Sequence, residues 1–139
     1  VLVTETGTGR IHRLWLAGPR AGERDLFREG LPGTPDNVTF NGRDTFWVTM
    51  PSLREGLDMM ADKPLLRRAV ALLPKNVRAA NSGSYSFVVG LGLDGRVTAN
   101  LQDSGIGFSN ITSAVECGGA LYLGSITMPS LARHRLDNP

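Results

Sequence analysis

Two segments of this sequence follow the same order of strand, tight turn and strand, and both close on the same four residues. The first covers residues 37–52 and turns at Asn41-Gly42, and the second covers residues 111–130 and turns at Gly118-Gly119. Such pairs favour the short turns of β-hairpins. A unit that recurs along a chain is typical of repeat architectures, in which each unit buries its apolar face against the next. The shared ending reads Thr49-Met50-Pro51-Ser52 in the first segment and Thr127-Met128-Pro129-Ser130 in the second.

The remaining sequence reads as further short strands separated by glycine, proline and asparagine. The predicted strands are residues 1–6, 10–16, 25–29, 37–40, 45–50, 86–93, 97–102, 111–117, 120–126 and 131–136. If each repeat is a four-stranded antiparallel sheet, these are the last three strands of one sheet, all four of a second and the first three of a third. We therefore predict an all-β fragment of a six-bladed β-propeller, about three blades long. The blades would cover residues 1–30, 31–103 and 104–139.

Residues 51–84 interrupt the second predicted blade. Within them, residues 64–73 carry apolar side chains at helical spacing, and Pro64 suits a first helical turn. Asp62 is placed to act near the N-cap, and Pro74 ends the helix. We predict a short helix in an insertion that leaves the sheet after its second strand, where it could cover one face of the propeller as a lid.

Composition narrows the classes of function. The chain has 139 residues, 41% hydrophobic and 20% charged, as in an ordinary globular protein. Its net charge of +2 is small and its basic residues are scattered, which argues against a nucleic-acid partner. Cys117, the one cysteine, excludes a disulfide within the chain and is expected in the apolar core. No apolar run is long enough to span a membrane. Both ends look cut, so we expect a fragment of a longer protein of undetermined compartment.

The first strand of each propeller blade lines the central channel, so the loops that lead into those strands deliver residues to the axis. The first such loop carries Asp36 and Asn37, whose carboxylate and amide oxygens suit a calcium ion. The alternative is that these two residues only cap a turn. The second loop brings Asn110, Thr112 and Ser113 to the channel. There they would contact a small-molecule substrate, or else only satisfy backbone groups of the loop.

Several runs resemble the strictosidine synthase-like family in order and spacing. They are Glu5-Thr6, residues 10–22, Leu31-Pro32-Gly33-Thr34-Pro35-Asp36-Asn37, Phe46-Trp47-Val48 and Leu121-Tyr122-Leu123-Gly124-Ser125. That family has six-bladed propellers related to the gluconolactonase and paraoxonase groups. The resemblance implies that this chain is roughly the C-terminal half, with further blades on its N-terminal side. It also implies that the position of Asp36 and Asn37 contributes to a calcium site.

One departure from the family bears on activity. By alignment, the catalytic glutamate of true strictosidine synthases falls at or next to Thr112, and no carboxylate lies between Asp103 and Glu116. The resemblance therefore implies a calcium-dependent hydrolase of small lactones or esters rather than a condensing enzyme. A non-catalytic propeller that binds a ligand or partner is the alternative, and strictosidine synthase-type condensation is a weaker one. The general base is not identified.

Other polar and aromatic residues are expected to be structural. Glu5 would orient a turn, and His12 and His134 would lie on outer strands away from the axis. Trp15 and Trp47 would pack between blades.

Overall fold

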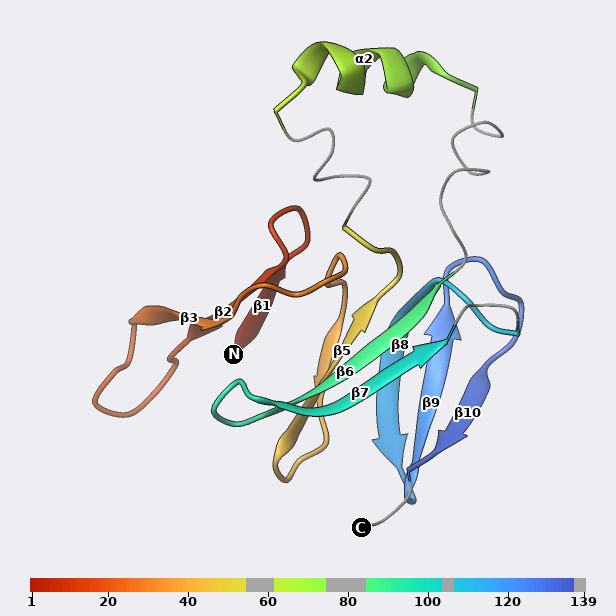
Figure 1. The fold of residues 1–139 in the computed structure, drawn as a ribbon. Helices are drawn as coiled ribbons and strands as arrows, with labels where there is room; N and C mark the ends of the chain where they lie inside the picture. The colour runs from red at the N-terminus through yellow and green to blue at the C-terminus, as the bar shows by residue number, and fades with distance from the viewer. Residues whose placement is uncertain (55–61, 75–84, 104–106, 137–139) are drawn as a thin grey trace.

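The computed structural model describes residues 1–54, 62–74, 85–103 and 107–136. These residues form three antiparallel sheets and one short helix (Figure 1), which confirms the predicted all-β fold. The sheets contain three, four and three strands in chain order, the grouping that the repeat predicted for part of a propeller. The exact blade boundaries stay predictions, and so does closure into a ring of six.

The first sheet contains β1 (Leu2–Glu5), β2 (Arg10–Leu14) and β3 (Arg24–Arg28), paired in that order. Along β1 the half-buried Leu2 and Thr4 alternate with the exposed Val3 and Glu5, so one face of this strand is covered and the other is open. Glu5 shapes the β1–β2 turn through its carbonyl oxygen, which accepts the backbone N–H groups of Thr8 and Gly9. The Glu5 side chain accepts a 2.9 Å hydrogen bond from His12 Nε2 on the neighbouring strand. Both residues thus have structural partners, as expected.

The second sheet is complete, with strand order β4 (Val38–Phe40), β5 (Thr45–Met50), β6 (Ser86–Gly92) and β7 (Val97–Asp103). The β4–β5 turn has four residues, as the predicted end of one strand at Phe40 and start of the next at Thr45 imply. The Asn41 side chain closes it, because its Oδ1 accepts the backbone N–H groups of the three residues from Arg43 to Thr45. Asparagine commonly closes turns in this way.

The third sheet contains β8 (Ile111–Cys117), β9 (Ala120–Ser125) and β10 (Ala132–Arg135). Gly118 and Gly119 form the two-residue β8–β9 turn, with φ of 55° and 72°. Positive φ at both central positions is the geometry that this glycine pair predicted. Cys117, expected in the core, is instead exposed at the end of β8. It lies on the open face of the sheet, because side chains alternate along a strand and Ala114 points to the buried face.

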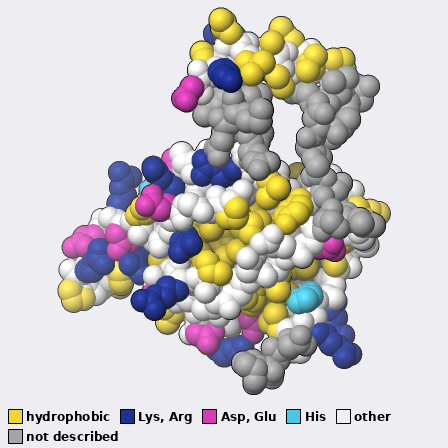
Figure 2. Space-filling model, in the orientation of Figure 1, with side chains coloured by type: hydrophobic (Ala, Val, Ile, Leu, Met, Phe, Trp, Pro, Cys, Tyr) yellow, Lys and Arg dark blue, Asp and Glu magenta, His cyan; other side chains and the backbone are white. Residues whose placement is uncertain are grey.

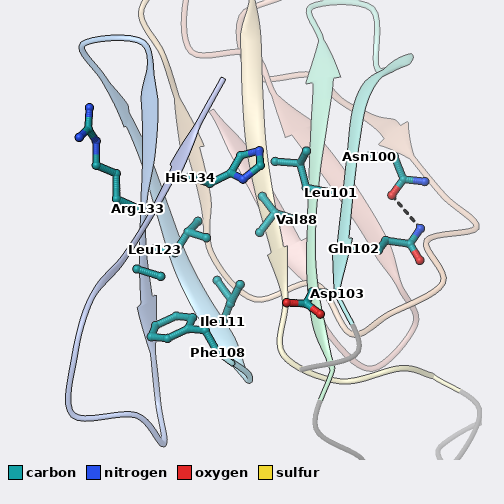
Figure 3. A pocket seen from close by; sticks show the side chains of 11 residues that line it. Val88, Asn100, Leu101, Gln102, Asp103, Phe108, Ile111, Leu123, Arg133 and His134 are labelled. Carbon is teal, nitrogen blue, oxygen red and sulfur yellow. Dashed lines mark hydrogen bonds between the residues drawn. The ribbon is translucent and has the colours of Figure 1, made fainter. Parts of the chain in front are cut away.

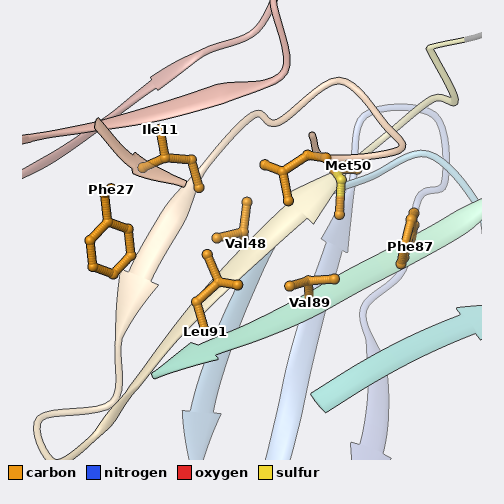
Figure 4. Packing of buried hydrophobic residues seen from close by; sticks show 8 residues of the cluster. Ile11, Phe27, Val48, Met50, Phe87, Val89 and Leu91 are labelled. Atoms are coloured by element: carbon orange, nitrogen blue, oxygen red, sulfur yellow. The ribbon is translucent and has the colours of Figure 1, made fainter. Parts of the chain in front are cut away.

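Two apolar clusters join the three sheets. The first packs Ile11 and Phe27 of the first sheet against Val48, Met50 and Leu91 of the second (Figure 4). Strand β4 lies next to β1, and β8 lies next to β4 and β5 in a corresponding arrangement. The sheets therefore stack face to face in sequence order, as propeller blades do.

Trp47 is central to the second cluster. It is buried with Val88 of its own sheet and with Ile111, Ala114 and Leu121 of the third sheet, which confirms its predicted packing between sheets. Gly90 makes room for it, since a Cβ atom there would lie 3.1 Å from the Trp47 ring. The space beside Gly90 is thus taken by the tryptophan that faces it on the neighbouring strand β5.

Helix α2 (Pro64–Leu72) lies between β5 and β6 in the chain and stands apart from the sheets (Figure 1). Its N-cap is Lys63, without a side-chain capping bond, so Asp62 does not cap the helix as expected. The rest of the predicted insertion, residues 55–61 and 75–84, lies outside the described residues. No helix in the described part of the chain is long and apolar enough to cross a membrane.

Trp15 differs from its expected role, because arginines rather than another sheet cover it. The guanidinium groups of Arg13 and Arg20 lie over its ring, 4.5 and 4.6 Å from the centroid. Asp25 joins the group by pairing with both arginines and accepting a hydrogen bond from the indole N–H. The pKa of Asp25 is held well below its ordinary value. The largest cause is the hydrogen bond from Arg13, and the hydrogen bond from Trp15 and the charges of both arginines contribute less.

This cluster predicts acid sensitivity. A carboxyl group whose pKa is lower in the folded protein adds stability above its unfolded pKa of about 3.9 and loses it as pH falls toward the folded pKa. We expect the stability difference between the full-length protein and its Asp25→Asn variant to be constant near neutral pH and to shrink below about pH 4. Urea midpoints at several pH values would measure it. Glu23→Gln is the control, since Glu23 also pairs with Arg20 but is more exposed; an equal pH effect of both variants would contradict the prediction.

Candidate functional site

The loops that lead into β4 and β8 meet at one end of the sheets. Asn37 immediately precedes β4, and its Nδ2 donates a 2.6 Å hydrogen bond to the carbonyl oxygen of Thr112, near the start of β8. The Thr49 hydroxyl donates to the same oxygen at 2.8 Å. Asn37 and Thr112, 75 positions apart in the sequence, are thus brought into direct contact.

The loop carrying Asp36 is held by its backbone. Thr34 N–H donates to the Ser52 carbonyl, and Asp36 N–H donates to the Thr49 carbonyl, each at 2.9 Å. The Asp36 carbonyl accepts the Thr4 hydroxyl at 2.6 Å, which ties the loop to the first sheet. Pro35 between them is fully buried. The repeated run that ends β5 therefore serves as the anchor for this loop.

Gly33 is required by the same anchoring. A Cβ atom at this position would lie 2.7 Å from Met50 Cβ and 2.8 Å from the Ser52 carbonyl oxygen. The close approach of the two backbones explains a glycine here without reference to flexibility. This close contact sets the position of the loop that carries Asp36 and Asn37 relative to the end of β5.

Two side-chain groups at this loop carry oxygen atoms that could bind a metal ion and that have no hydrogen-bond or ion-pair partner among the described residues. They are the half-buried carboxylate of Asp36 and the Oδ1 atom of the exposed Asn37. Because Nδ2 of Asn37 is bound to Thr112, its Oδ1 is oriented rather than freely rotating. Carboxylate and amide oxygens are ligands that calcium accepts, but calcium takes six to eight. The oxygen atoms of Asp36 and Asn37 could therefore supply part of such a site.

The remaining ligands of any such ion would come from outside this group. Among the described residues, no cluster of three or more His, Cys, Asp or Glu side chains lies in a position to hold a metal ion. The assignment of Asp36 and Asn37 as calcium ligands therefore stays a prediction.

Asn110 occupies the position in the third sheet that Asn37 occupies in the second. Each directly precedes the first strand of its sheet. The Asn37 carbonyl accepts the Thr49 N–H group on β5, and the Asn110 carbonyl accepts the Ile126 N–H group just after β9. Asn110 has φ of 53°, a left-handed conformation that asparagine tolerates better than most residues. Its Nδ2 donates to the Pro51 carbonyl at 3.1 Å, which links the second and third sheets. Sequence analysis named both residues but missed their equivalence, although both come just before a hairpin.

Thr112 and Ser113 lie at a bulge in the β8–β9 pairing, which shifts register between Ile111 and Ser113. Ser113 faces Gly124 across the ladder, and a Cβ atom on that glycine would lie 2.5 Å from Ser113 Oγ. The Thr112 hydroxyl has no partner among the described residues. Bulges commonly re-aim side chains beside functional sites. Substrate contact by Asn110, Thr112 and Ser113 stays a prediction.

Glu116 has a role that sequence analysis did not find. Its side chain is only 10% exposed and accepts hydrogen bonds from Trp47 Nε1 at 2.8 Å and Asn41 Nδ2 at 3.0 Å. It also pairs with Arg43. A buried carboxylate needs such partners, and here all three come from the second sheet. Glu116 therefore anchors the third sheet to the second and is not available as a general base.

A cavity of about 390 Å³ opens elsewhere, between β6 and β7 on one side and β9 and β10 on the other. Its floor is apolar and includes Val88, Leu101 and Leu123, and His134 points into it while Arg133 points away (Figure 3). His134 lies on the outer strand, as expected. The cavity does not include any of the predicted site residues.

Stacked antiparallel sheets, here of three, four and three strands, with polar loops gathered where the first strands begin, are consistent with part of a β-propeller. No protein-family model matches the chain. It is 33% identical over 99% of its length to adipocyte plasma membrane-associated protein of Gallus gallus, and 34% identical over 98% to that of Bos taurus. It is 35% identical over 98% of its length to Arabidopsis thaliana protein strictosidine synthase-like 10.

The chain belongs to the strictosidine synthase-like family. It spans 35% of the length of both animal relatives and 38% of the Arabidopsis protein, so it corresponds to little more than a third of each. The family resemblance seen in the sequence is thereby confirmed.

Proposed function

We propose that the full-length protein hydrolyses small lactones or esters at the end of the propeller where Asn37 meets Thr112, and that the activity depends on calcium. The observation that supports this is the contact between the two loops. Nδ2 of Asn37 is fixed, while the Asp36 carboxylate and Asn37 Oδ1 have no partner among the residues that the structure describes. Oriented and unpartnered oxygen atoms are suited to bind a hard cation.

Some residues of this chain would bind the calcium ion, and others would contact the substrate. Asp36 supplies negative charge, and the Asn37–Thr112 bond keeps the amide oxygen in place. The Thr112 hydroxyl and Ser113 lie beside this pair and would contact the substrate, as would Asn110. A bound calcium ion would polarise the carbonyl group of the substrate as a Lewis acid. None of the described carboxylates next to this group is assigned as the general base.

Condensation of the strictosidine synthase type is a weaker alternative. The catalytic glutamate of that reaction falls at or next to Thr112, and a hydroxyl group does not replace a carboxylate as a proton acceptor near neutral pH. The nearby Glu116 does not compensate, because its side chain is occupied by Trp47, Asn41 and Arg43.

A non-catalytic propeller that binds a ligand or partner is the second candidate. The name of the animal relatives, adipocyte plasma membrane-associated protein, refers to a location and to no reaction. In this case the same end of the sheets would bind its ligand without turnover.

The ligand assignment predicts a measurable loss. In the full-length protein, Asp36→Ala and Asn37→Ala should each lower calcium affinity by at least about tenfold, since even partners of metal ligands cost that much when removed. Calorimetric titration with calcium would measure it, and hydrolysis of a panel of lactones and esters with and without calcium would measure activity. Glu29→Ala removes an exposed carboxylate just after β3; it is the control and should change neither calcium affinity nor activity.

The outcomes separate the candidates. Unchanged calcium binding in both variants would refute the ligand assignment. Calcium binding that depends on Asp36 and Asn37, without hydrolysis of any substrate on the panel, would favour the binding propeller. Hydrolysis that is indifferent to calcium would contradict the metal-dependent mechanism.

A further inference from the structure

Helix α2 carries apolar side chains that are largely exposed. Leu65 and Leu72 are 78% and 86% exposed, and Leu66 and Leu73 are exposed as well. Among its described side chains only Val70 is partly buried. Yellow side chains accordingly gather on the surface of the helix in Figure 2. Exposed apolar clusters of this kind mark sites of interaction.

The apolar residues share one side of the helix. Leu65, Ala69 and Leu72 recur at helical spacing, with Leu66, Val70 and Leu73 beside them. Arg68, three residues after Leu65 and four before Leu72, borders this apolar side, where a long basic side chain can reach toward headgroups. The sequence of residues 62–74 contains three basic residues, Lys63, Arg67 and Arg68, and one acidic residue, Asp62. The segment is therefore amphipathic and cationic, as helices that lie in the surface of a bilayer are.

The helix also needs a partner to be stable. It has nine residues, no side-chain N-cap and no acidic residue in its first turn. Helices shorter than about 12–15 residues are marginal in water without packing. A lysine at the N-cap opposes the helix dipole further. Local interactions therefore do not account for this helix, whereas burial of its leucines would.

The same end of the sheets exposes further apolar residues. Leu53, just after β5, and Ile126, just after β9, are 40% and 75% exposed. Asn110 links the segments that carry them, because its Nδ2 donates to the Pro51 carbonyl and its carbonyl accepts the Ile126 N–H group. Since α2 follows β5 in the chain, the helix and these two residues belong to one end of the molecule.

We propose that α2 lies on an anionic lipid surface, with its leucines in the boundary of the acyl chains and its basic residues toward the headgroups. The cationic charge of the segment favours lipid over an apolar protein groove. The exposed Leu53 and Ile126 would reinforce the same face. This assignment does not depend on the hydrolase proposal, because no residue of the calcium or substrate group takes part.

The first experiment measures whether the surroundings of α2 become apolar when lipid is added. An environment-sensitive fluorophore is attached at Leu72→Cys in the full-length protein, with Cys117→Ser because Cys117 is exposed. On addition of phosphatidylcholine vesicles containing phosphatidylserine, the emission should shift to the blue, and quenchers in the acyl chains should reduce it. The shift should weaken with salt, since screening reduces attraction between the cationic helix and the lipid. A probe at Leu93→Cys, on the β6–β7 turn, is the control and should not respond.

The second experiment tests the leucines. Leu65→Glu should lower the lipid affinity measured by the Leu72 probe by at least about tenfold, because a buried leucine is worth more than that factor. Leu93→Glu, which changes an equally apolar and 55% exposed residue, should leave it unchanged. Far-ultraviolet circular dichroism checks that both variants stay folded.

Three results would overturn the proposal. The Leu72 probe could show no shift with phosphatidylserine vesicles at low salt. It could be shielded already without lipid, which would mean that α2 closes over its own protein as a lid. Or Leu65→Glu could change the oligomeric state and not the lipid affinity, which would assign the helix to a second copy of the protein.

Discussion

Replacing Trp47 with alanine is expected to lower the free energy of unfolding of the full-length protein by about 3–5 kcal/mol, the range for truncating a buried aromatic side chain. Trp47 is 4% exposed and lies in the cluster that joins the second and third sheets. Its removal would leave a cavity beside Gly90 and an unfilled hydrogen bond at Glu116. Urea denaturation followed by circular dichroism would measure the loss.

Two variants separate packing from hydrogen bonding at this position. Trp47→Phe keeps most of the apolar area but removes the indole N–H, and should cost about 1–3 kcal/mol, mostly through the buried Glu116 carboxylate. Glu116→Gln keeps the shape and removes the charge that Arg43 pairs with. If Trp47→Ala costs less than about 1 kcal/mol, contrary to the range for buried aromatics, the two sheets do not depend on this cluster.

Gly95→Ala is expected to be nearly as damaging. Gly95 lies in the β6–β7 turn with φ of 81°, and a Cβ atom there would lie 2.4 Å from the Phe27 carbonyl oxygen on β3. Left-handed backbone costs an alanine about 1–2 kcal/mol. The steric contact adds about 1–3 kcal/mol, because the turn would have to move away from the first sheet. The Arg28 guanidinium also reaches the Gly95 carbonyl, so such a movement would weaken a second contact between the sheets.

The chain supplies a matched control for the steric contribution. Gly42 has φ of 80°, but a Cβ atom there would have no neighbour within 4 Å. Gly42→Ala should therefore show the backbone cost alone. The difference in unfolding free energy between the two variants measures how tightly the second sheet packs on the first. Equal losses would mean that the β6–β7 turn does not support that packing.

Local features of the sequence were sufficient to predict the strands. Alternation of apolar side chains depends on the two-residue period of a strand, and turn residues act within two to four positions. For this reason residues 45–50 and 111–117 were predicted with the bounds that the structure has. The four-residue β4–β5 turn agrees with the predicted strand ends, whereas the three hydrogen bonds that Asn41 Oδ1 accepts were not predicted.

The candidate site was located from sequence only through the assumption of a propeller. That assumption brought Asp36, Asn37 and Thr112 to one end, and the bond between Asn37 and Thr112 agrees with it. The equivalence of Asn37 and Asn110 was missed, because the loops before them differ in sequence and their likeness lies in backbone hydrogen bonds. No local signal marked Glu116 as an anchor, since its three partners belong to another sheet.

The sequence by itself determined where strands, turns and the helix form, because those choices depend on neighbours along the chain. The tertiary structure alone decided which faces are covered. Cys117 was expected in the core but is exposed. Trp15 and Trp47 were both expected between sheets, yet only Trp47 is buried there, whereas Trp15 is covered by arginines. Burial depends on contacts between residues far apart in the chain. These are fixed only when whole sheets stack, and stacking sums many weak interactions that no short segment contains.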